Sequence, residues 1–442
     1  MSNITIEIQQ TNQLPAGYKQ TAVGVIPEDW EVKRFDDIFE FHSTNSFSRE
    51  NLTDNETESK VKNIHYGDIH SKFKNGILNC KEEKLPFIKD ELLLNKNLNF
   101  VQEGDLIIAD ASEDYEGVGE CVEVLNVGEN KIVSGLHTFL ARDYSNETII
   151  GFRNYIFKNQ KVGIELKKIA TGISVYSISK TNLQKLLLPT PPLPEQQKIA
   201  EILSTWDNAI DNCKKIIKKL KKRNKGLAQQ LLTGKTRVKG FEDTKWENKR
   251  LKDIAIRVTA KNEELNDTVV TISAQRGFVL QEDFFNKRVA SDTLLNYYLL
   301  KKGQFAYNKS YSNGYPMGAF KRLDNFEKAV VTTLYICFEL KKNVDSDFMN
   351  YFFENGMMVN YLMKVAQEGG RAHGLLNIGL DDFFNLKLTI PSKDEQEKIV
   401  SILVNATNEL KQYEQKLANL QIQKKGLMQQ LLTGKVRVKL NK

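Results

Sequence analysis

A long segment of the chain occurs twice, and this repeat constrains the fold more than any other feature of the sequence. Residues 195–239 and 395–439 align without a gap at an offset of 200 residues, and about half of their positions are identical. A repeat of this length indicates that the whole architecture is duplicated. A chain of 442 residues has room for two or three domains with separate cores, so two similar halves are expected.

Each copy of the repeat has the pattern of a long helix with a coiled-coil seam. Apolar residues recur in alternating steps of four and three, which places them along one helix face. Each seam carries one polar residue at the same place, Asn224 or Lys424, and such a residue usually fixes the register. About 38 residues of helix give a rod of roughly 57 Å. The predicted seam residues are Ile199, Leu203, Trp206, Ile210, Ile217, Leu220 and Leu227 in the first copy, and Ile399, Leu403, Leu410, Tyr413, Leu417, Leu420 and Leu427 in the second.

The connections between the copies decide how the two helices pair. The first helix leads directly into the second variable region at Gly240, and the second helix follows that region. Helices connected in this way run antiparallel if their seams pair within one chain. The sequence therefore predicts an intramolecular antiparallel coiled coil with one variable domain at each end. The same symmetry predicts that residues 435–442 meet residues 18–29, so that the two chain ends lie together.

The two halves also begin alike and then diverge. Trp30 corresponds to Trp246, and Lys33-Arg34 corresponds to Lys249-Arg250. We expect each tryptophan to pack its domain against a helix end rather than to contact a ligand. The divergence that follows is expected if a scaffold was kept while a binding surface changed. The polar run 43–60 is expected to be an insertion that forms a mobile loop.

Short apolar runs bounded by Gly, Asn and Asp predict strands in both variable regions, and longer patterns predict helices. Each variable region is therefore expected to be a mixed α/β (α+β) domain. The predicted strands are 105–109, 119–124, 137–141, 269–272 and 330–338, and the predicted helices are 154–170 and 347–366. The expected boundaries are 1–24 for an N-terminal segment, 25–192 and 235–391 for the two domains, 193–234 and 392–434 for the helices, and 435–442 for a tail.

Positive charge is concentrated in the helical repeats. The chain has a formal net charge of +7, whereas the first repeat holds twelve Lys and Arg against four Asp and Glu, and the second holds eight against four. Basic helices suit a polyanion or an acidic partner. A solvated helix face has the same composition, so charge alone leaves both interpretations open.

Other features favour a cytoplasmic protein. The chain has no run of 18 apolar residues, and its N-terminal residues have neither the basic nor the apolar part of an export signal. Cys80, Cys121, Cys213 and Cys337 are widely scattered, which predicts reduced core thiols rather than disulfides.

Catalytic motifs are also absent from the sequence. Gly234-Lys235-Thr236 lacks the glycine spacing of a phosphate-binding loop and is typical of a helix end. Thr190-Pro191-Pro192-Leu193 lacks the amide or acid and the aromatic ring of the amino-methyltransferase loop. The histidines are not spaced with cysteines or carboxylates as metal ligands. We therefore expect no catalysis and no metal site in this chain.

Two motifs flank each long helix. They are Pro192-Leu193-Pro194-Glu195-Gln196-Gln197-Lys198-Ile199 before the first helix and Leu231-Leu232-Thr233-Gly234-Lys235 at its end. With two variable domains and a second helix copy, this arrangement resembles the DNA specificity subunit of type I restriction-modification systems. The second copy departs from the pattern at Pro391-Ser392-Lys393-Asp394-Glu395, where the Pro-Leu pair is absent.

This resemblance implies a function for each part of the chain. The two variable domains would be target recognition domains, each binding one half of a split double-stranded DNA site. The helices would act as a ruler and would dock two modification (methyltransferase) subunits. Those subunits would bind S-adenosylmethionine and methylate adenine, while restriction subunits would supply cleavage and ATP-driven translocation with Mg. No cofactor is expected in this chain itself.

Candidate DNA contacts follow from side-chain chemistry alone. Base edges need bidentate or amide donors and acceptors on loops, and phosphates need Lys, Arg, Ser or backbone amides. The candidate DNA contacts are Lys72, Lys74, Asn75, Ser112, Tyr115, Ser174, Tyr176 and Lys180 in the first domain, and Gln275, Arg276, Asn308, Lys309, Tyr311, Asn313, Tyr315, Arg371 and His373 in the second.

The alternative function for this chain is a two-headed DNA-binding regulator or an assembly scaffold without a methyltransferase partner.

Overall fold

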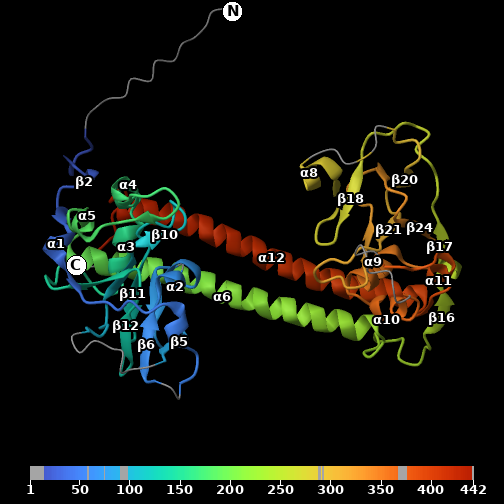
Figure 1. The fold of residues 1–442 in the computed structure, drawn as a ribbon, viewed down its shortest axis with the longest axis horizontal. Helices are drawn as coiled ribbons and strands as arrows, with labels where there is room; N and C mark the ends of the chain where they lie inside the picture. The colour runs from blue at the N-terminus through green and yellow to red at the C-terminus, as the bar shows by residue number, and fades with distance from the viewer. Residues whose placement is uncertain are drawn as a thin grey trace, which may run out of the picture. The chain divides into compact units, whose positions relative to one another are not determined.

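Two long helices carry the repeated segments, α6 (Leu193–Leu232) and α12 (Lys393–Leu432). The structure is a computed structural model that describes residues 14–56, 59–73, 75–89, 98–286, 290, 293–366 and 376–440. The chain divides into unit 1, residues 1–213 and 416–442, and unit 2, residues 214–415. Each unit therefore contains one variable domain, one part of α6 and one part of α12 (Figure 1).

The variable domain of unit 1 contains two larger sheets. A five-stranded sheet has the order β4-β13-β9-β11-β7, and a four-stranded sheet has the order β12-β6-β8-β5. Two of the pairs, β7 with β11 and β6 with β12, are parallel. The elements are β1 (Tyr18–Thr21), β2 (Gly24–Pro27), β3 (Glu31–Arg34), α1 (Phe35–Ile38), β4 (Phe39–His42), η1 (Arg49–Asn51), β5 (Leu52–Thr53), β6 (Val61–Ile64), α2 (Tyr66–Ser71), β7 (Ile77–Asn79), β8 (Phe87–Ile88), β9 (Leu106–Ala109), β10 (Ala111–Ser112), β11 (Cys121–Leu125), β12 (Lys131–Ser134), β13 (Thr138–Asp143), α3 (Arg153–Lys158), α4 (Gln160–Ile169), β14 (Tyr176–Ser177), α5 (Lys180–Gln184) and β15 (Leu187–Thr190).

The variable domain of unit 2 contains one four-stranded antiparallel sheet of order β17-β24-β21-β22 and several two-stranded sheets. The elements are β16 (Glu247–Arg250), α7 (Leu251–Ile254), β17 (Ala255–Arg257), β18 (Val270–Ser273), β19 (Gly277–Leu280), α8 (Gln281–Phe285), β20 (Tyr298–Lys301), β21 (Phe305–Asn308), β22 (Ala319–Arg322), β23 (Lys328–Val331), β24 (Ile336–Leu340), α9 (Ser346–Glu354), α10 (Val359–Leu362), α11 (Leu380–Phe384) and β25 (Lys387–Ile390).

In unit 1 the two long helices run antiparallel. Asp207 in α6 forms an ion pair of 2.5 Å with Lys424 in α12. Earlier in α6, Ile199 shares a hydrophobic core with Leu431, which comes later in α12. As the residue number rises along α6, the number of its partner in α12 therefore falls. The pairing direction is the one that the chain connections predict.

Unit 2 shows the same pairing direction in its own parts of the helices. Asn224 donates a hydrogen bond of 2.8 Å to the carbonyl oxygen of Ala406. Further along α6, Leu231 shares a core with Ile399, which comes earlier in α12. Each predicted seam residue is buried or half-buried. The predicted fold, mixed α/β domains with long helices paired antiparallel, is thereby confirmed.

A buried glutamate near the start of α6 joins the first domain to the helices. The Glu195 carboxylate accepts a hydrogen bond of 2.9 Å from the Trp30 indole and two of 2.8 Å from the Arg437 guanidinium. Arg437 also binds Asp29 at 2.6 Å. Trp30 is fully buried, so the expectation that it packs its domain against a helix end is confirmed. These contacts also confirm that C-terminal residues meet the segment 18–29.

Unit 2 repeats this junction with the equivalent residues. Glu395 accepts a hydrogen bond of 3.2 Å from Trp246 and bonds of 3.0 and 2.8 Å from Arg237. Gly234 ends α6 with φ at +69°, and a Cβ there would lie 3.2 Å from the Trp246 ring. The helix end therefore needs glycine both for its backbone angle and for its closeness to the tryptophan.

Three predicted elements are divided in the structure. The helix predicted over 154–170 is two helices, because Asn159 is extended and its side chain accepts a hydrogen bond from Lys161 N at the start of α4. The helix predicted over 347–366 is interrupted at Gly356, whose φ is +73°. The strand predicted over 330–338 is two strands, β23 and β24, separated by a turn in which Tyr335 N donates to Thr332 O.

The polar run 43–60 is also ordered over the part that the structure describes. It contains η1 and β5, and β5 pairs antiparallel with β8. Arg49 in this run forms two hydrogen bonds of 3.0 and 2.8 Å with the buried carboxylate of Asp68 in α2. The mobility of this run stays a prediction, but its polar composition did not reveal the short strand or the contact of the half-exposed Arg49 with the buried Asp68 carboxylate.

The cysteines and helices agree with the remaining sequence expectations. Cys80, Cys121, Cys213 and Cys337 are free and buried, as predicted for core thiols. Within the described ranges, no helix combines the length and apolarity needed to cross a bilayer.

Candidate nucleic-acid interface

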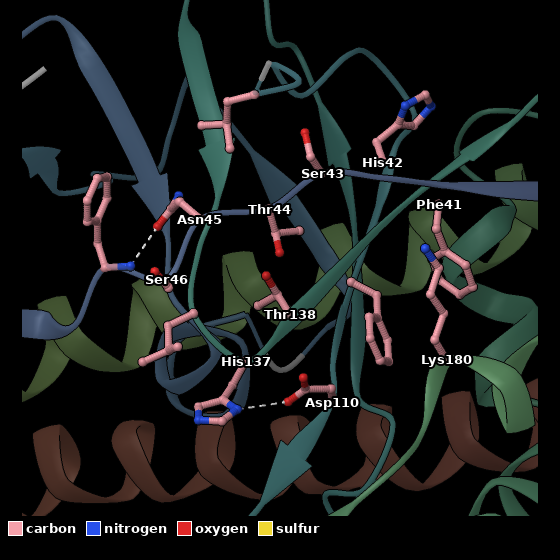
Figure 2. Close-up of a pocket in the computed structure, with 14 residues that line it drawn as sticks. Phe41, His42, Ser43, Thr44, Asn45, Ser46, Asp110, His137, Thr138 and Lys180 are labelled. Atoms are coloured by element: carbon pink, nitrogen blue, oxygen red, sulfur yellow. Dashed lines mark hydrogen bonds and ion pairs between the residues drawn. The ribbon is translucent and has the colours of Figure 1, made fainter. Parts of the chain in front are cut away.

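A pocket of about 670 Å³ lies in the domain of unit 1 (Figure 2). Its walls come from five separate stretches of the chain: the end of β4 with the residues after it, Leu98, the residue after β9, the turn into β13 and the start of α5. We call this the unit 1 pocket. Its lining residues are Phe41, His42, Ser43, Thr44, Asn45, Ser46, Phe47, Leu98, Asp110, Leu136, His137, Thr138, Phe139 and Lys180.

Backbone pairing and one asparagine hold the wall of this pocket. β4 pairs antiparallel with β13, which brings Phe41 and Phe139 to a ring separation of 5.3 Å. After β4 the chain is fixed by Asn45, whose backbone N and side-chain Nδ2 both donate to the carbonyl oxygen of Ser134 at 2.9 Å. Asn45 Nδ2 also contacts Asn63 Oδ1 at 2.7 Å. The hydroxyl groups of residues 43, 44 and 46 therefore stand on a fixed segment.

Charged and titratable groups also line the pocket. His137 has a left-handed backbone with φ at +55°, and its Nδ1 lies 3.2 Å from Asp110 Oδ1 (Figure 2). Burial raises the pKa of the Asp110 carboxyl, and the neighbouring His137 opposes that shift. Lys180 Nζ lies 4.8 Å from the centroid of the Phe41 ring. A cation, an imidazole, hydroxyls and aromatic rings around one hollow are groups that can contact phosphates, base edges and base faces.

A short sheet brings together candidates from two distant stretches. β10 and β14 pair antiparallel, with Ser112 opposite Tyr176, and the rings of Tyr115 and Tyr176 are 5.2 Å apart. Ser174 and Lys180 are exposed on either side of β14. Ser112 is buried, and its Oγ accepts a hydrogen bond from Asp114 N, so it stabilises a turn. Tyr115 and Tyr176 therefore lie together, Ser174 is exposed in the loop before β14, and Lys180 after β14 lines the unit 1 pocket.

Two other candidates in this domain are occupied by contacts within the protein. Lys72 forms an ion pair of 3.0 Å with the buried Asp68, four residues earlier in the chain. Asn75 Nδ2 lies 3.3 Å from both carboxylate oxygens of Asp211 in α6. Lys74 lies outside the described residues. Lys72 therefore stabilises the buried Asp68 carboxylate, and Asn75 connects the variable domain to α6.

Three histidines of this domain gather around one tyrosine. The Tyr66 ring lies 4.7 Å from the His65 ring, 6.2 Å from His70 and 5.4 Å from His137. The Glu120 carboxylate, 3.6 Å from His70 Nδ1, raises the pKa of His70, whereas burial lowers the pKa of His65. Within the described part of the chain, no group of three or more His, Cys, Asp or Glu side chains is arranged to hold a metal ion.

The candidates of unit 2 meet at two neighbouring loops. Gln275 Nε2 donates to the carbonyl oxygen of Asn313 at 3.1 Å, which joins the loop after β18 to the loop after β21. Tyr311 at the second loop is 65% exposed. Arg276 lies over the Phe284 ring at 5.7 Å. The exposed candidates of this surface are therefore Gln275, Arg276, Tyr311 and Asn313.

The other candidates of unit 2 stabilise these loops. Asn308 Oδ1 accepts a hydrogen bond from Ser310 N, and the backbone oxygen of Lys309 accepts one from Leu376 N. Tyr315 OH donates to Glu354, and burial together with that carboxylate raises the pKa of Tyr315 to about 12. Tyr315 also lines a pocket of about 280 Å³ that includes residues of α6. Arg371 and His373 lie outside the described residues.

Asp110, His137 and the segment after β4 were not among the sequence candidates. Their positions in the chain are far apart, and no motif connects them. The one available signal was the density of Ser, Thr and Asn in residues 43–46, which is typical both of a loop and of a polar binding surface.

A family profile matches this chain twice. The type I restriction modification DNA specificity domain matches residues 27–222 and 243–421. The type I restriction enzyme MjaVIII specificity subunit of Methanocaldococcus jannaschii is 26% identical over 449 residues, covering 94% of this chain and 94% of that protein. A second protein of that organism, provisionally named the MjaX specificity subunit, is 26% identical over 454 residues, covering 96% and 97%.

A solved structure has a similar fold. The HsdS subunit from Thermoanaerobacter tengcongensis matches with a TM-score of 0.50 and 13% identity, covering 93% of this chain and 98% of that one. Because the family profile covers most of the chain in two copies, this chain belongs to the family of type I restriction-modification DNA specificity subunits.

Proposed function

We propose that this chain is the sequence-specificity subunit of a type I restriction-modification complex and binds a bipartite double-stranded DNA site. The observation that carries the proposal is the duplication. The DNA specificity profile matches once in each half, and each half has its own set of candidate contacts on a similar scaffold. Each variable domain then acts as a target recognition domain for one half-site, and the two half-sites differ because the two surfaces differ.

The long helices serve as the spacer between the half-sites. Each has 40 residues and is about 60 Å long, which exceeds one turn of DNA at roughly 34 Å. The polar contacts of Asp207 with Lys424 and of Asn224 with Ala406 support a fixed register, and a fixed register gives a fixed spacing between half-sites.

Catalysis belongs to other subunits, because specificity subunits of type I systems are non-catalytic. Two modification subunits dock on this chain, bind S-adenosylmethionine and methylate adenine within the site. Restriction subunits add ATP- and Mg-dependent translocation and cleavage. The basic faces of the two repeats support contact with DNA or with acidic partner surfaces. The complex works in the cytoplasm, where the DNA is.

Sequencing of methylated bases in the host genome tests this function. We compare cells that carry the gene, cells that lack it, and cells in which it has been restored. The expected result is one bipartite motif with methylated adenine that disappears with the gene and returns with it. If no such motif depends on the gene, the specificity role is wrong and a regulator or scaffold becomes the better explanation.

A further inference from the structure

The loop between Thr171 and Ser177 presents an isolated apolar side chain to solvent. Ile173 is 92% exposed, the most exposed large hydrophobic side chain among the residues that the structure describes, and Val175 is 54% exposed. Their neighbours in the loop, Thr171, Ser174 and Ser177, are polar. Water disfavours such an apolar tip, so its burial against a partner would be favourable.

The base of this loop is held firmly. Thr171 and Ser177 exchange two backbone hydrogen bonds of 2.9 and 2.8 Å. Gly172 has φ at +126°, and a Cβ at this position would lie 2.0 Å from the carbonyl oxygen of Val175. Only glycine fits there, so this turn requires glycine at position 172, while the two Thr171–Ser177 hydrogen bonds close its base. Ile173 therefore stands on a loop with a closed base.

The loop is adjacent to the candidate DNA-contacting residues of unit 1. Immediately after it, Ile178 N donates to the carbonyl oxygen of Asp110, which lines the unit 1 pocket. Lys180, two residues further, lines the same pocket. A DNA half-site that contacts the pocket would therefore lie next to the base of this loop.

We propose that Ile173 is a wedge that enters between two base pairs of the half-site bound by unit 1 and partly unstacks them. This inference rests on the proposed DNA-binding function. Apolar side chains inserted between base steps, usually from the minor groove, bury themselves in the stack and kink the duplex. The hydroxyl groups of Ser174 near the tip and of Thr171 and Ser177 at the base of the loop suit contacts with the sugar-phosphate backbone.

The size of the apolar surface favours DNA over a protein partner. A stable protein interface buries roughly 800 Å² on each partner and has a contiguous apolar centre. Here the apolar surface consists of two aliphatic side chains on one narrow loop with the rings of Tyr176 and Tyr115 beside them, which is too little for such an interface. A gap between stacked bases, in contrast, accepts a single side chain.

The test uses the complex purified from its own cells by a tag on this chain, with duplexes that carry the methylated motif. 2-Aminopurine replaces one adenine at a time along the half-site, where it still pairs with thymine, and its fluorescence rises where it unstacks. We expect the fluorescence to rise at one base step that does not include the methylated adenine. A rise at that position is distinct from any signal caused by base extrusion during methylation. Ile173→Ala should abolish that rise and weaken binding about tenfold or more.

Ile173→Leu is the matched control and should preserve both the signal and the binding. The melting temperature of each variant should be unchanged, because an exposed side chain adds little to stability. If the parent complex binds the duplex but Ile173→Ala behaves identically, the wedge is wrong and the DNA-binding function stands. If Ile173→Ala instead loses only its modification subunits, Ile173 is a protein contact and the wedge is again wrong. If the parent complex binds no duplex, the proposed function itself is wrong.

Discussion

The carboxylates of Glu195 and Glu395 are held alike in the two units, whereas the candidate DNA-contacting loops of the units are built differently. Each glutamate is 1% exposed and binds one tryptophan indole and one arginine. In unit 1 the candidate surface centres on a pocket with Asp110 and His137, but in unit 2 it centres on loops joined by Gln275. This comparison teaches that the duplicated part of the chain positions each variable domain on the helices, and that the diverged loops determine what each domain binds.

Loss of the junction arginine should destabilise both units by similar amounts. Arg437→Ala leaves the buried Glu195 carboxylate without its bidentate partner, and Arg237→Ala does the same to Glu395. We expect each change to lower the free energy of unfolding by about 3 kcal/mol. Urea denaturation measures the loss, and hydrogen exchange of the paired strands β3 and β15 or β16 and β25 assigns it to a unit.

Lysine substitutions at the two arginines are the matched controls. Lysine keeps the charge but cannot form the planar two-point contact, so intermediate losses are expected at both sites. A large loss at one junction and none at the other would show that the two junctions are not equivalent.

Loss of the polar seam residue should lower the free energy of unfolding more in unit 1 than in unit 2. Lys424→Ala leaves Asp207 buried with only the Tyr155 hydroxyl as a partner in the described residues, at 2.9 Å. Asn224→Ala in unit 2 removes the hydrogen bond to the Ala406 carbonyl and the exposed hydrogen bonds that Asn224 Oδ1 accepts from the neighbouring Arg223. We expect losses of about 2 kcal/mol for the first change and about 1 kcal/mol for the second, from urea midpoints. Replacing Lys424 and Asp207 together by apolar residues should recover most of the loss, and equal losses from the two single changes would refute the distinction.

Low pH should destabilise unit 1 because it protonates the buried Asp68 carboxylate. Burial raises the pKa of this carboxyl, but hydrogen bonds from Arg49 and Lys72 outweigh burial, so its pKa in the folded protein lies below the ordinary 3.8. A group with a lowered pKa contributes stability above the ordinary value, and this contribution is lost as the pH falls through the folded pKa. We expect a loss on the order of 1 kcal/mol in unit 1 between pH 5 and pH 3, measured by thermal unfolding. Asp68→Asn should remove this part of the pH dependence, and an unchanged pH profile would contradict it.

The sequence predicted the parts of the fold that repeat or follow a period. The seam spacing and the chain connections sufficed for two long antiparallel helices, and the paired tryptophans indicated the two junctions. The sequence could not predict that Asn159 and Gly356 divide helices, because one capping side chain or one left-handed glycine overrides a good helical pattern.

The candidate site was predicted less well for a physical reason. Tyr115 and Tyr176 come together because β10 pairs with β14, and Asp110 meets His137 because β9 pairs with β13. Such contacts depend on strand pairing between distant segments, which a single sequence does not specify. Lys72, by contrast, has a side chain suited to a phosphate contact, but it forms an ion pair with the buried Asp68 carboxylate four residues earlier.

The central claim is that each unit binds its own half of one bipartite DNA site. Methylated-base sequencing of cells that carry either Lys180→Ala in unit 1 or Tyr311→Ala in unit 2 tests it most directly, since both side chains are exposed at their candidate surfaces. The result we predict is that the first variant relaxes or loses recognition of one half of the motif and the second variant affects only the other half. If both variants change the same half, or both reduce methylation at the two halves equally, the claim is contradicted.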